Sequence, residues 1–323
     1  MKKLYFITNL QSGKSAIRGK LAAVIDRFTA AGYEVTVRTT QERMDACAAA
    51  EYACLDGRFD LIVCSGGDGT LNETVQGLMH SQQPLPLGYI PCGSTNDFSK
   101  SLRVPSEIED AAEWLLSGRR YQCDVGVFNS RHFLYIAAFG AFTSASYDTP
   151  QNMKNFMGHF AYVLRSLMLV PTIRPLRVKI EYDGKVIEDD FIYGMVSNTA
   201  AVAGMLKMRS FQLDDGRFEV MLIRRPGSVM DLQHIIAQLM NLDEDVDPDY
   251  VQYFRAGKLR FISNEEIPWT VDGEYGGMTC DTEISVCKRA LTFCVGEDAP
   301  ENDEALPALP PTDGTGTGEK KEE

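Results

Sequence analysis

A glycine-rich segment with an embedded carboxylate is the strongest chemical signal in the chain. It runs from Ser65 to Glu73 and directly follows the apolar, strand-like sequence DLIVC. A Gly-Gly-x-Gly turn between a strand and a helix lets backbone N–H groups approach phosphate oxygens without interference from Cβ atoms. Asp68 in such a loop would repel phosphate unless a divalent cation lay between them, so we expect it to act through Mg²⁺. A plain tight turn built on Asp68 and Gly69 is the alternative.

A second polar loop, Pro91–Phe98, follows the next strand-like sequence, LGYIP. Its small residues supply hydrogen-bonding groups, and Asp97 supplies a second carboxylate. Taken alone, the stretch from Ser94 to Asp97 is equally typical of a helix N-cap. Because parallel strands bring the loops at their carboxyl ends to one edge of a sheet, we expect Asp68 and Asp97 to lie close together.

A third candidate loop, Asn9–Ser15, ends in the Gly-Lys-Ser sequence of a Walker A motif. Thr8 stands where that motif requires its first glycine, so the chain is not a P-loop NTPase. A turn of small residues can still hold phosphate at the start of the first helix.

The elements that must position these loops alternate between strand and helix over the first 120 or so residues. KLYFITN, EVTVRTT, DLIVCSG and LGYIPCG are short, β-rich sequences that end in small or polar residues. Between the first two, apolar residues recur on one helical face and the pattern stops at Gly32. This alternation predicts a layered α/β domain with a parallel sheet.

The pattern changes after Tyr121. Strand–turn–strand sequences dominate, with Asp183-Gly184 as a hairpin turn and two helical stretches near 151–170 and 228–241. The expected fold is therefore an α/β N-terminal nucleotide-binding domain plus a mostly antiparallel β-sandwich or open barrel. The expected boundaries are 1–122 for the first domain, 123–298 for the second, and 299–323 for a disordered acidic tail.

Charge and cysteine usage narrow the function classes. Acidic residues outnumber basic ones 45 to 32, which gives a net charge of −13 and argues against a nucleic-acid partner. The eight cysteines show no CxxC pairing and suit free thiols in a reducing compartment. With neither a signal peptide nor a membrane-spanning stretch in view, we expect a cytoplasmic protein. The oligomeric state stays open, a homodimer included.

Together these loops resemble the diacylglycerol kinase catalytic family, in particular its soluble bacterial lipid kinases. The resemblance rests on GGDGT at 66–70 with Asn72-Glu73, on GSTNDF at 93–98, on LDDG at 213–216 and on VDGE at 271–274. It covers roughly residues 3–295. NAD kinases share the GGDG core and are the competing family. Protein kinases lack this pattern and have signature elements that are absent here.

The resemblance implies a set of site residues. ATP is expected to contact Asn9, Leu10, Gln11, Ser12, Gly13, Thr40, Gly66, Gly67, Asp68, Gly69, Thr70, Leu71, Asn72, Glu73 and Ser94. Asp68 and Asp97 match the aspartates that organise Mg²⁺ and water around the phosphates, with Asp124 as a third. A structural Mg²⁺ in the β-rich domain would use Asp215 and the backbone oxygens of Gln212 and Arg217, although Asp214-Asp215-Gly216 is also a typical β-turn. Glu274 matches the general base of the family.

Two further segments allow more than one interpretation. Apolar residues at helical spacing, Phe156, Phe160, Val163, Leu164 and Leu167, suit either core packing or a wall for acyl chains at a membrane surface. The acidic run 243–249 lacks the central glycine and terminal glutamate of an EF-hand and is expected to be a solvated loop.

The expected function is transfer of the γ-phosphate of ATP to a lipid hydroxyl, with Mg²⁺ as cofactor and diacylglycerol as the first choice of acceptor. The enzyme would associate peripherally with the inner membrane face. Phosphatidylglycerol and sphingoid bases also present a primary hydroxyl, so they stay open as acceptors. NAD kinase-like transfer to a soluble nucleotide is the alternative reaction, and a catalytically silent sensor is the alternative class.

Overall fold

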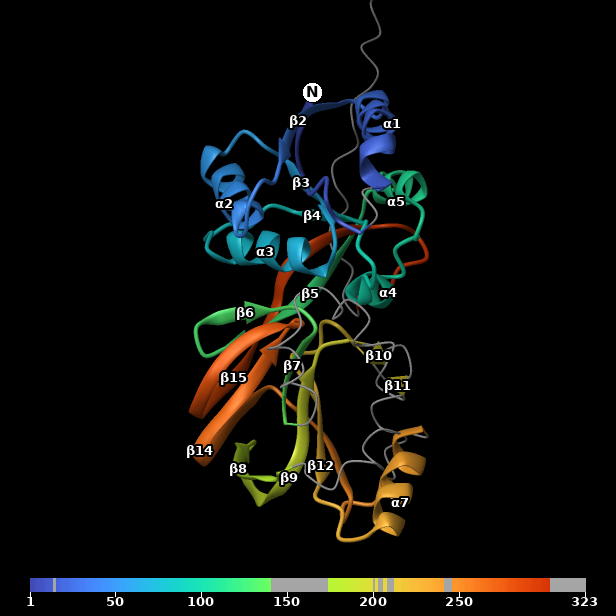
Figure 1. Cartoon of the computed structure of the whole chain (residues 1–323). Helices are drawn as coiled ribbons and strands as arrows, with labels where there is room; N and C mark the ends of the chain where they lie inside the picture. Colours follow the sequence, from blue (N-terminus) through green and yellow to red (C-terminus); the bar gives the residue numbers. More distant parts are fainter. Residues whose placement is uncertain are drawn as a thin grey trace, which may run out of the picture.

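The structure is a computed structural model in which residues 1–13, 16–140, 174–199, 201–202, 206–207, 212–240 and 246–302 are described. Two domains lie one above the other, and long strands run between them (Figure 1). The predicted apolar helix at 151–170 lies outside the described residues, as do the tail from 303 onward and the first part of the acidic run, 243–245.

The first domain is the predicted α/β layer structure. Its parallel strands stand in the order β4-β3-β1-β2. Helices cover both faces of the sheet, with α2 and α3 on one side and α1 and α5 on the other (Figure 1). The bounds are β1 Lys2–Thr8, α1 Ala16–Ala30, β2 Tyr33–Thr39, α2 Asp45–Asp56, β3 Leu61–Gly66, α3 Asp68–Met79, β4 Leu87–Pro91, α4 Asp97–Leu102 and α5 Ile108–Leu115.

Alternation along β1 explains the two layers. Leu4 and Phe6 pack into the core beneath α1 and α5, whereas Tyr5 and Ile7 pack into the core beneath α2 and α3. Successive side chains of a strand point to opposite faces, so a strand covered on both sides must be apolar throughout. Strand β3 is buried along its entire length for the same reason.

The second domain is antiparallel β, as predicted. Strands β7, β9, β8 and β14 form a closed ring of hydrogen-bonded neighbours. Aromatic side chains pack among these strands. The ring of Trp269 contacts the rings of Phe128, Phe139 and Phe261, with centroids 4.9–5.1 Å apart. The bounds are β5 Arg119–Phe128, β6 Arg131–Phe133, β7 Ile136–Gly140, β8 Leu176–Tyr182, β9 Lys185–Ser197, β10 Ala201–Val202, β11 Leu206–Lys207, β12 Phe218–Arg224, α7 Val229–Met240, β13 Val251–Ala256, β14 Lys258–Val271 and β15 Glu274–Val295.

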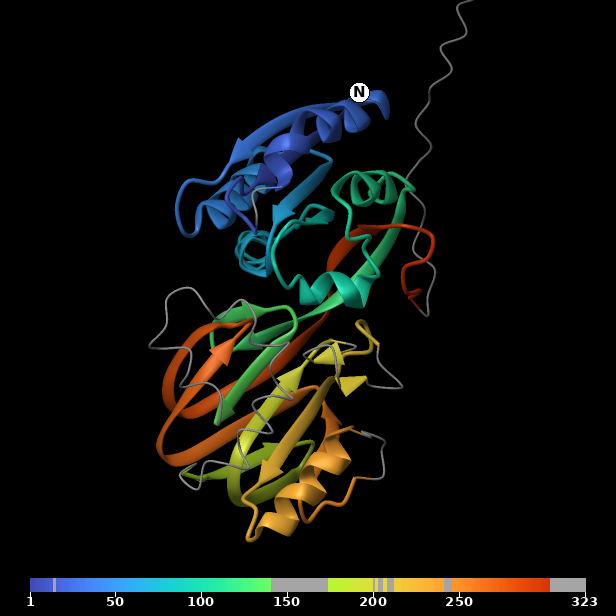
Figure 2. The same cartoon turned by 45° about the vertical axis from the view of Figure 1, so that its right-hand side comes forward.

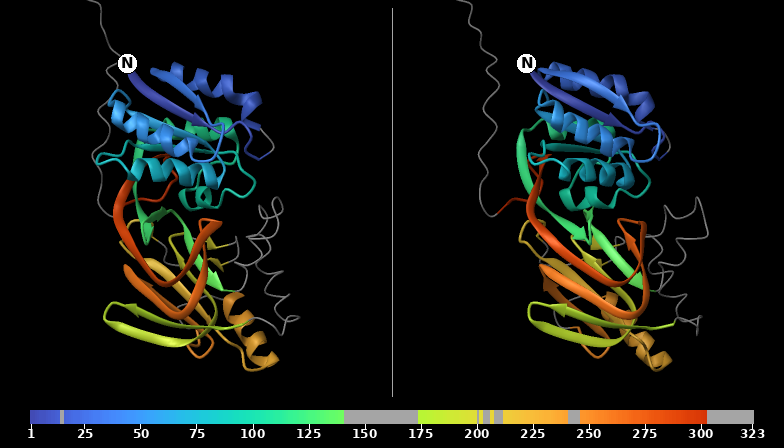
Figure 3. Two further views of the ribbon diagram at one scale, coloured as in Figure 1. Left: turned by 60° about the vertical axis from the view of Figure 1, so that its left-hand side comes forward. Right: turned by 90° about the vertical axis from the view of Figure 1, so that its left-hand side faces the viewer.

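Two strands join the domains. Strand β15 pairs with β14 in the second domain and ends beside β4, where Phe293 is the parallel partner of Leu87. Strand β5 runs antiparallel along the later part of β15, from Ile284 to Val295. Figures 2 and 3 show β15 rising from the β-rich domain into the α/β domain. Strand β15 therefore extends the sheet of the first domain.

The predicted helix at 228–241 is confirmed as α7. In the part of the chain that the structure describes, no helix combines the length and the apolar character needed to cross a bilayer. All eight cysteines lie in described residues and are free thiols, as expected; five are buried, Cys54 and Cys287 are half-buried, and Cys280 is exposed.

The contact between α2 and α3 depends on one glycine. A Cβ atom on Gly77 would lie 2.2 Å from the carbonyl oxygen of Cys47 and 2.9 Å from the Cβ of Ala50. Since a backbone atom cannot move aside as a flexible side chain can, the close packing of these helices requires a residue without a side chain at 77.

We expect Gly77→Ala to lower the free energy of unfolding by about 1–3 kcal/mol, because overpacking outweighs the better helix propensity of alanine. Gly19→Ala in α1 is the matched control, since nothing lies within 4 Å of its Cβ position. There the propensity gain should appear alone, as about 0.5–1 kcal/mol of added stability. Urea unfolding of both variants measures the difference, and equal shifts would show that the α2–α3 contact relaxes freely.

Candidate active site

The structure brings the three predicted loops together at the carboxyl ends of β1, β3 and β4. The Asn9 side chain donates to Thr70 Oγ1 at 3.2 Å, and the backbone N–H of Gly67 donates to Ser12 Oγ at 3.2 Å. A Cβ atom on Gly93 would lie 2.6 Å from the Cα of Gly67. The loops thus share one edge of the sheet, which is the ligand edge of a parallel α/β domain.

Asp68 and Asp97 meet at this edge, as the sequence predicted. Asp68 Oδ2 accepts the backbone N–H of Asp97 at 3.3 Å, and Lys100 Nζ lies 2.8 Å from Asp97 Oδ1. Burial, together with the charge of Asp97, raises the pKa of the Asp68 carboxyl to about 6. Both residues begin helices, Asp68 in α3 and Asp97 in α4.

Two carboxylate oxygens at this edge are buried and unpaired. Among the described residues, neither Asp68 Oδ1 nor Asp97 Oδ2 has a hydrogen-bond partner. Leaving such an atom buried costs free energy unless something binds it. The pair therefore fits a divalent cation that takes its other ligands from phosphates and water, as Mg²⁺ commonly does. No cluster of three acidic, histidine or cysteine side chains suited to a metal occurs within the described chain.

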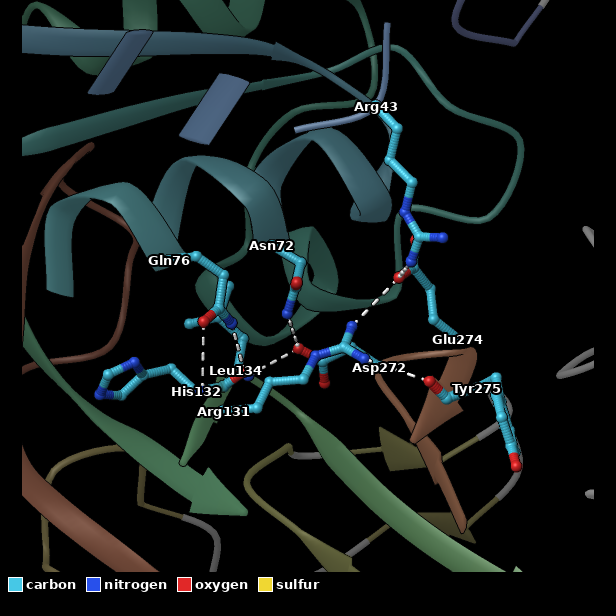
Figure 4. Close-up of polar contacts among 9 residues, drawn as sticks. All are labelled: Arg43, Asn72, Gln76, Arg131, His132, Leu134, Asp272, Glu274 and Tyr275. Atoms are coloured by element: carbon cyan, nitrogen blue, oxygen red, sulfur yellow. Dashed lines mark hydrogen bonds and ion pairs between the residues drawn. The ribbon is translucent and has the colours of Figure 1, made fainter. Parts of the chain in front are cut away.

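Glu274 faces the start of α3 from the other domain. It is the first residue of β15, and its Oε1 lies 3.9 Å from the position that a Cβ atom would take on Gly69. Its Oε2 forms ion pairs with Arg43 at 2.9 Å and Arg131 at 3.1 Å (Figure 4). The Glu274 side chain is 37% exposed. Its Oε2 is held by the two arginines, whereas its Oε1 faces the glycine-rich loop.

Asp272, two residues earlier, is a buried anchor that the sequence did not reveal. Its carboxylate accepts the Asn72 side-chain amide at 2.6 Å and the backbone N–H groups of Leu134, Tyr135 and Ile136 at 2.8–3.0 Å (Figure 4). Burial raises the pKa of this carboxyl, and the hydrogen bonds oppose the rise. Asp272 therefore ties α3 to the chain between β6 and β7.

A second contact one helical turn later reinforces this tie. Gln76 donates its side-chain amide to the carbonyl oxygen of His132 and accepts the His132 N–H at 3.2 Å. Asn72 and Gln76 are four residues apart and so lie on the same face of α3. Two successive turns of the helix are thereby bonded to the β-rich domain, which fixes the distance between the loop and Glu274.

The other positions predicted for ATP fall into two groups. Thr40 donates its backbone N–H to Thr8 at 3.0 Å, which places it at the same sheet edge as the loops. Leu10, Gln11 and Gly13 belong to the Asn9–Ser15 loop, and Ser94 is exposed in the Pro91–Phe98 loop. The Leu71 side chain, by contrast, lies in the apolar core, and the amide of Asn72 is bonded to Asp272. Nucleotide contact at each of these positions, Gly66 and Glu73 included, stays a prediction.

Asp124 is bonded to the 212–217 loop. Its carboxylate accepts the N–H groups of Gly216 at 2.6 Å and Arg289 at 2.7 Å. Both oxygens are used in these bonds, and residue type alone could not reveal this. A role for Asp124 beside Asp68 and Asp97 stays a prediction. Asp124 is fully buried, and burial raises the pKa of its carboxyl.

The second predicted metal site is closed by an arginine. Asp215 Oδ1 accepts the N–H of Arg217 at 2.8 Å, and Asp215 Oδ2 is paired with Arg255. Arg255 Nε also lies 3.2 Å from Glu219, whose pKa burial raises to about 8. As arranged, the Asp215 carboxylate has no free oxygen, so it fits an ion pair better than a metal. Magnesium at Gln212, Asp215 and Arg217 stays a prediction.

We expect Asp272→Asn to lower the free energy of unfolding by about 1–3 kcal/mol. The side-chain NH₂ of asparagine would face N–H groups that donate to the Asp272 carboxylate, and these buried donors would lose their acceptor. Asp183→Asn is the control: Asp183 and Asp272 both precede glycine in a turn with positive φ, but the Asp183 side chain is 43% exposed. Its change should stay within about 0.5 kcal/mol. Equal small effects of the two variants in urea unfolding would contradict the anchoring role of Asp272.

For Asp68, the raised pKa and the free oxygen predict linked effects of protons and Mg²⁺ on stability. The native state holds the Asp68 proton more tightly than the unfolded chain does, so in EDTA this group's stabilisation falls as pH rises from about 4 to 6. Asp68→Asn removes that fall. At pH 7, Mg²⁺ should raise the melting temperature of the wild type but not of the variant. Equal shifts in both proteins would place the metal elsewhere.

Comparison with known proteins agrees with this geometry. The model of the diacylglycerol kinase catalytic domain matches residues 3–128, and that of the YegS C-terminal NAD kinase beta sandwich-like domain matches residues 139–295. The chain is 35% identical over 306 residues to a diacylglycerol kinase of Bacillus subtilis, covering 94% of this chain and 100% of that protein. It is 34% identical over 277 residues to one of Staphylococcus carnosus, covering 85% and 90%.

Solved structures show the same architecture. A crystal structure of a diacylglycerol kinase from Bacillus anthracis superposes with a TM-score of 0.73 at 24% identity, covering 92% of this chain and 97% of that one. Another chain from that organism gives a TM-score of 0.79 at 25% identity, with 92% and 96% covered. With both domains matched in order, and curated relatives aligned over nearly the whole chain, the protein belongs to the diacylglycerol kinase family of lipid kinases.

Proposed function

We propose that this kinase transfers the γ-phosphate of ATP to the hydroxyl group of diacylglycerol and so produces phosphatidic acid. The observation that carries the proposal is the position of Glu274 Oε1, 3.9 Å from a Cβ placed on Gly69, at the N-terminus of α3. A carboxylate there faces the phosphate loop from the opposite domain. The names of the relatives support diacylglycerol as the acceptor.

In this proposal the phosphate chain of ATP binds at the start of α3. Backbone N–H groups of the Gly67–Thr70 turn and the helix dipole attract the phosphate oxygens. Asp68 and Asp97 would hold Mg²⁺, which supplies neutralisation of phosphate charge when it is bound. Because these loops belong to one sheet edge, they hold the γ-phosphate at a fixed place relative to the rest of the domain.

Glu274 then acts as the general base. Its Oε1 takes the proton of the acceptor hydroxyl while the oxygen of that hydroxyl bonds to the γ-phosphorus. The bond from this phosphorus to the β–γ bridging oxygen breaks, and its electron pair leaves on ADP. General-base assistance of this kind contributes about 10² to 10⁴-fold to a rate. The enzyme would work at the inner membrane surface, where its acceptor resides.

The proposal is tested by transfer of labelled phosphate from ATP to a panel of acceptors in mixed micelles. The panel contains diacylglycerol, phosphatidylglycerol, a sphingoid base and, in a separate reaction, NAD. Label in diacylglycerol above the other lipids supports the proposal. Label in another lipid alone would retain the lipid kinase and replace its acceptor. Label in NAD alone would instead favour NAD kinase-like transfer to a soluble nucleotide, the activity named in the match to the C-terminal domain.

Glu274→Gln should lower kcat by about 10² to 10⁴-fold, because glutamine keeps the shape of glutamate but cannot take a proton. The KM for ATP and the melting temperature should stay nearly unchanged, since the side chain is partly exposed and lies at the start of a strand. The measurement is steady-state transfer to the best acceptor of the panel. A variant that keeps most of its kcat would exclude Glu274 as the base.

A further inference from the structure

Glu274 is held by two arginines that come from different domains. Arg43 lies between β2 and α2 in the α/β domain, whereas Arg131 begins β6 in the β-rich domain. Both guanidinium groups reach the same oxygen, Oε2, at 2.9 and 3.1 Å. In Figure 4 the two side chains approach the carboxylate from opposite sides. This arrangement leaves Oε1 as the oxygen toward Gly69.

Arg131 is itself fixed in place. Its Nη1 donates to the carbonyl oxygen of Tyr275 at 3.2 Å, and its side chain is only 30% exposed. The next residue, His132, is bonded through its backbone to Gln76 of α3. The guanidinium that holds the carboxylate is therefore placed by the same strand that docks on the phosphate-loop helix.

Arg43 differs because its side chain is 73% exposed. The residue after it, Met44, adopts a left-handed conformation with φ of 68°. A side chain other than glycine in that conformation costs of order 1 kcal/mol, and such strain persists where the surrounding structure imposes it. The Arg43 side chain extends from the α/β domain to Glu274, the proposed general base, in the β-rich domain.

We propose that Arg131 and Arg43 are positioning residues that hold Oε2 of Glu274 so that Oε1 faces the acceptor hydroxyl. The inference rests on the proposed function of Glu274 as the base. A carboxylate on a flexible chain samples several rotamers, and two ion pairs to one oxygen select the rotamer in which the other can take a proton. Neither arginine needs to contact ATP or the lipid for this role.

The test compares Arg131→Ala and Arg43→Ala with matched controls in the same transfer assay. Arg131→Ala should lower kcat by about 10- to 100-fold, the cost of misplacing a reacting group, while the KM for ATP changes less than about twofold. Arg131→Lys should restore part of the loss, because it keeps the charge but not the second donor. Arg43→Ala should have a smaller effect of the same kind. Because Arg43 is exposed, this variant gives a reading even if Arg131→Ala folds poorly.

The controls remove an exposed arginine of the same domain that lies outside the site. Arg58→Ala removes a pair with Asp56 in the α/β domain, and Arg260→Ala removes a pair with Asp281 in the β-rich domain. Both should leave kcat unchanged. An unchanged kcat in Arg131→Ala and Arg43→Ala as well would overturn the proposal, and so would a rise in the KM for ATP without loss of kcat.

Combination with Glu274→Gln separates the two proposals. If the arginines act through Glu274, adding Arg131→Ala to Glu274→Gln causes no further loss of kcat. Multiplied losses would mean that Arg131 contacts the substrate itself, and the positioning role would be wrong while the base stands. Activity retained by Glu274→Gln alone would instead remove the base, and the positioning role with it.

Discussion

The buried carboxylate of Asp272 is the constraint on which the site depends. A charge removed from water is costly unless hydrogen bonds replace its hydration, and Asp272 obtains four of them. One donor belongs to α3 of the α/β domain and three belong to the backbone before and at the start of β7. A single anion therefore sets the position of the glycine-rich loop against the turn that carries Glu274.

The fold and the three loops could be predicted because their signals are local. A strand buried on both faces, a helical stripe or a glycine-rich turn is visible within about ten residues. The anchoring role of Asp272 could not be predicted, since Asp183-Gly184 and Asp272-Gly273 have the same turn sequence and both aspartates have positive φ. They differ in burial, and the partner that distinguishes Asp272 lies 200 residues away. Glu274 was a predicted site residue, but its ion pair with Arg43, 231 residues away, could not be predicted for the same reason.

The aspartates show why residue type does not determine role. Within the described chain, Asp68 and Asp97 each keep one buried oxygen without a protein partner, which suits a bound cation. Asp124 is also an aspartate and is fully buried, yet two backbone N–H groups use both of its oxygens. Its carboxylate holds the loop that precedes β12. The sequence identifies carboxylates as candidates. Only the number of carboxylate oxygens left without a protein partner distinguishes a candidate metal ligand from a structural anchor.

The path of β15 has a consequence for how the chain folds. This strand carries Glu274 at its beginning and lies beside Leu87 of β4 near its end, so the sheet of the first domain includes residues more than 200 positions downstream. During synthesis the first 120 residues can form helices and most of a sheet, but the β4 edge stays unpaired until β15 has emerged. Contacts of such sequence separation slow folding and favour completion of both domains together. The strand that carries Glu274 is thus also the one that completes the sheet of the first domain.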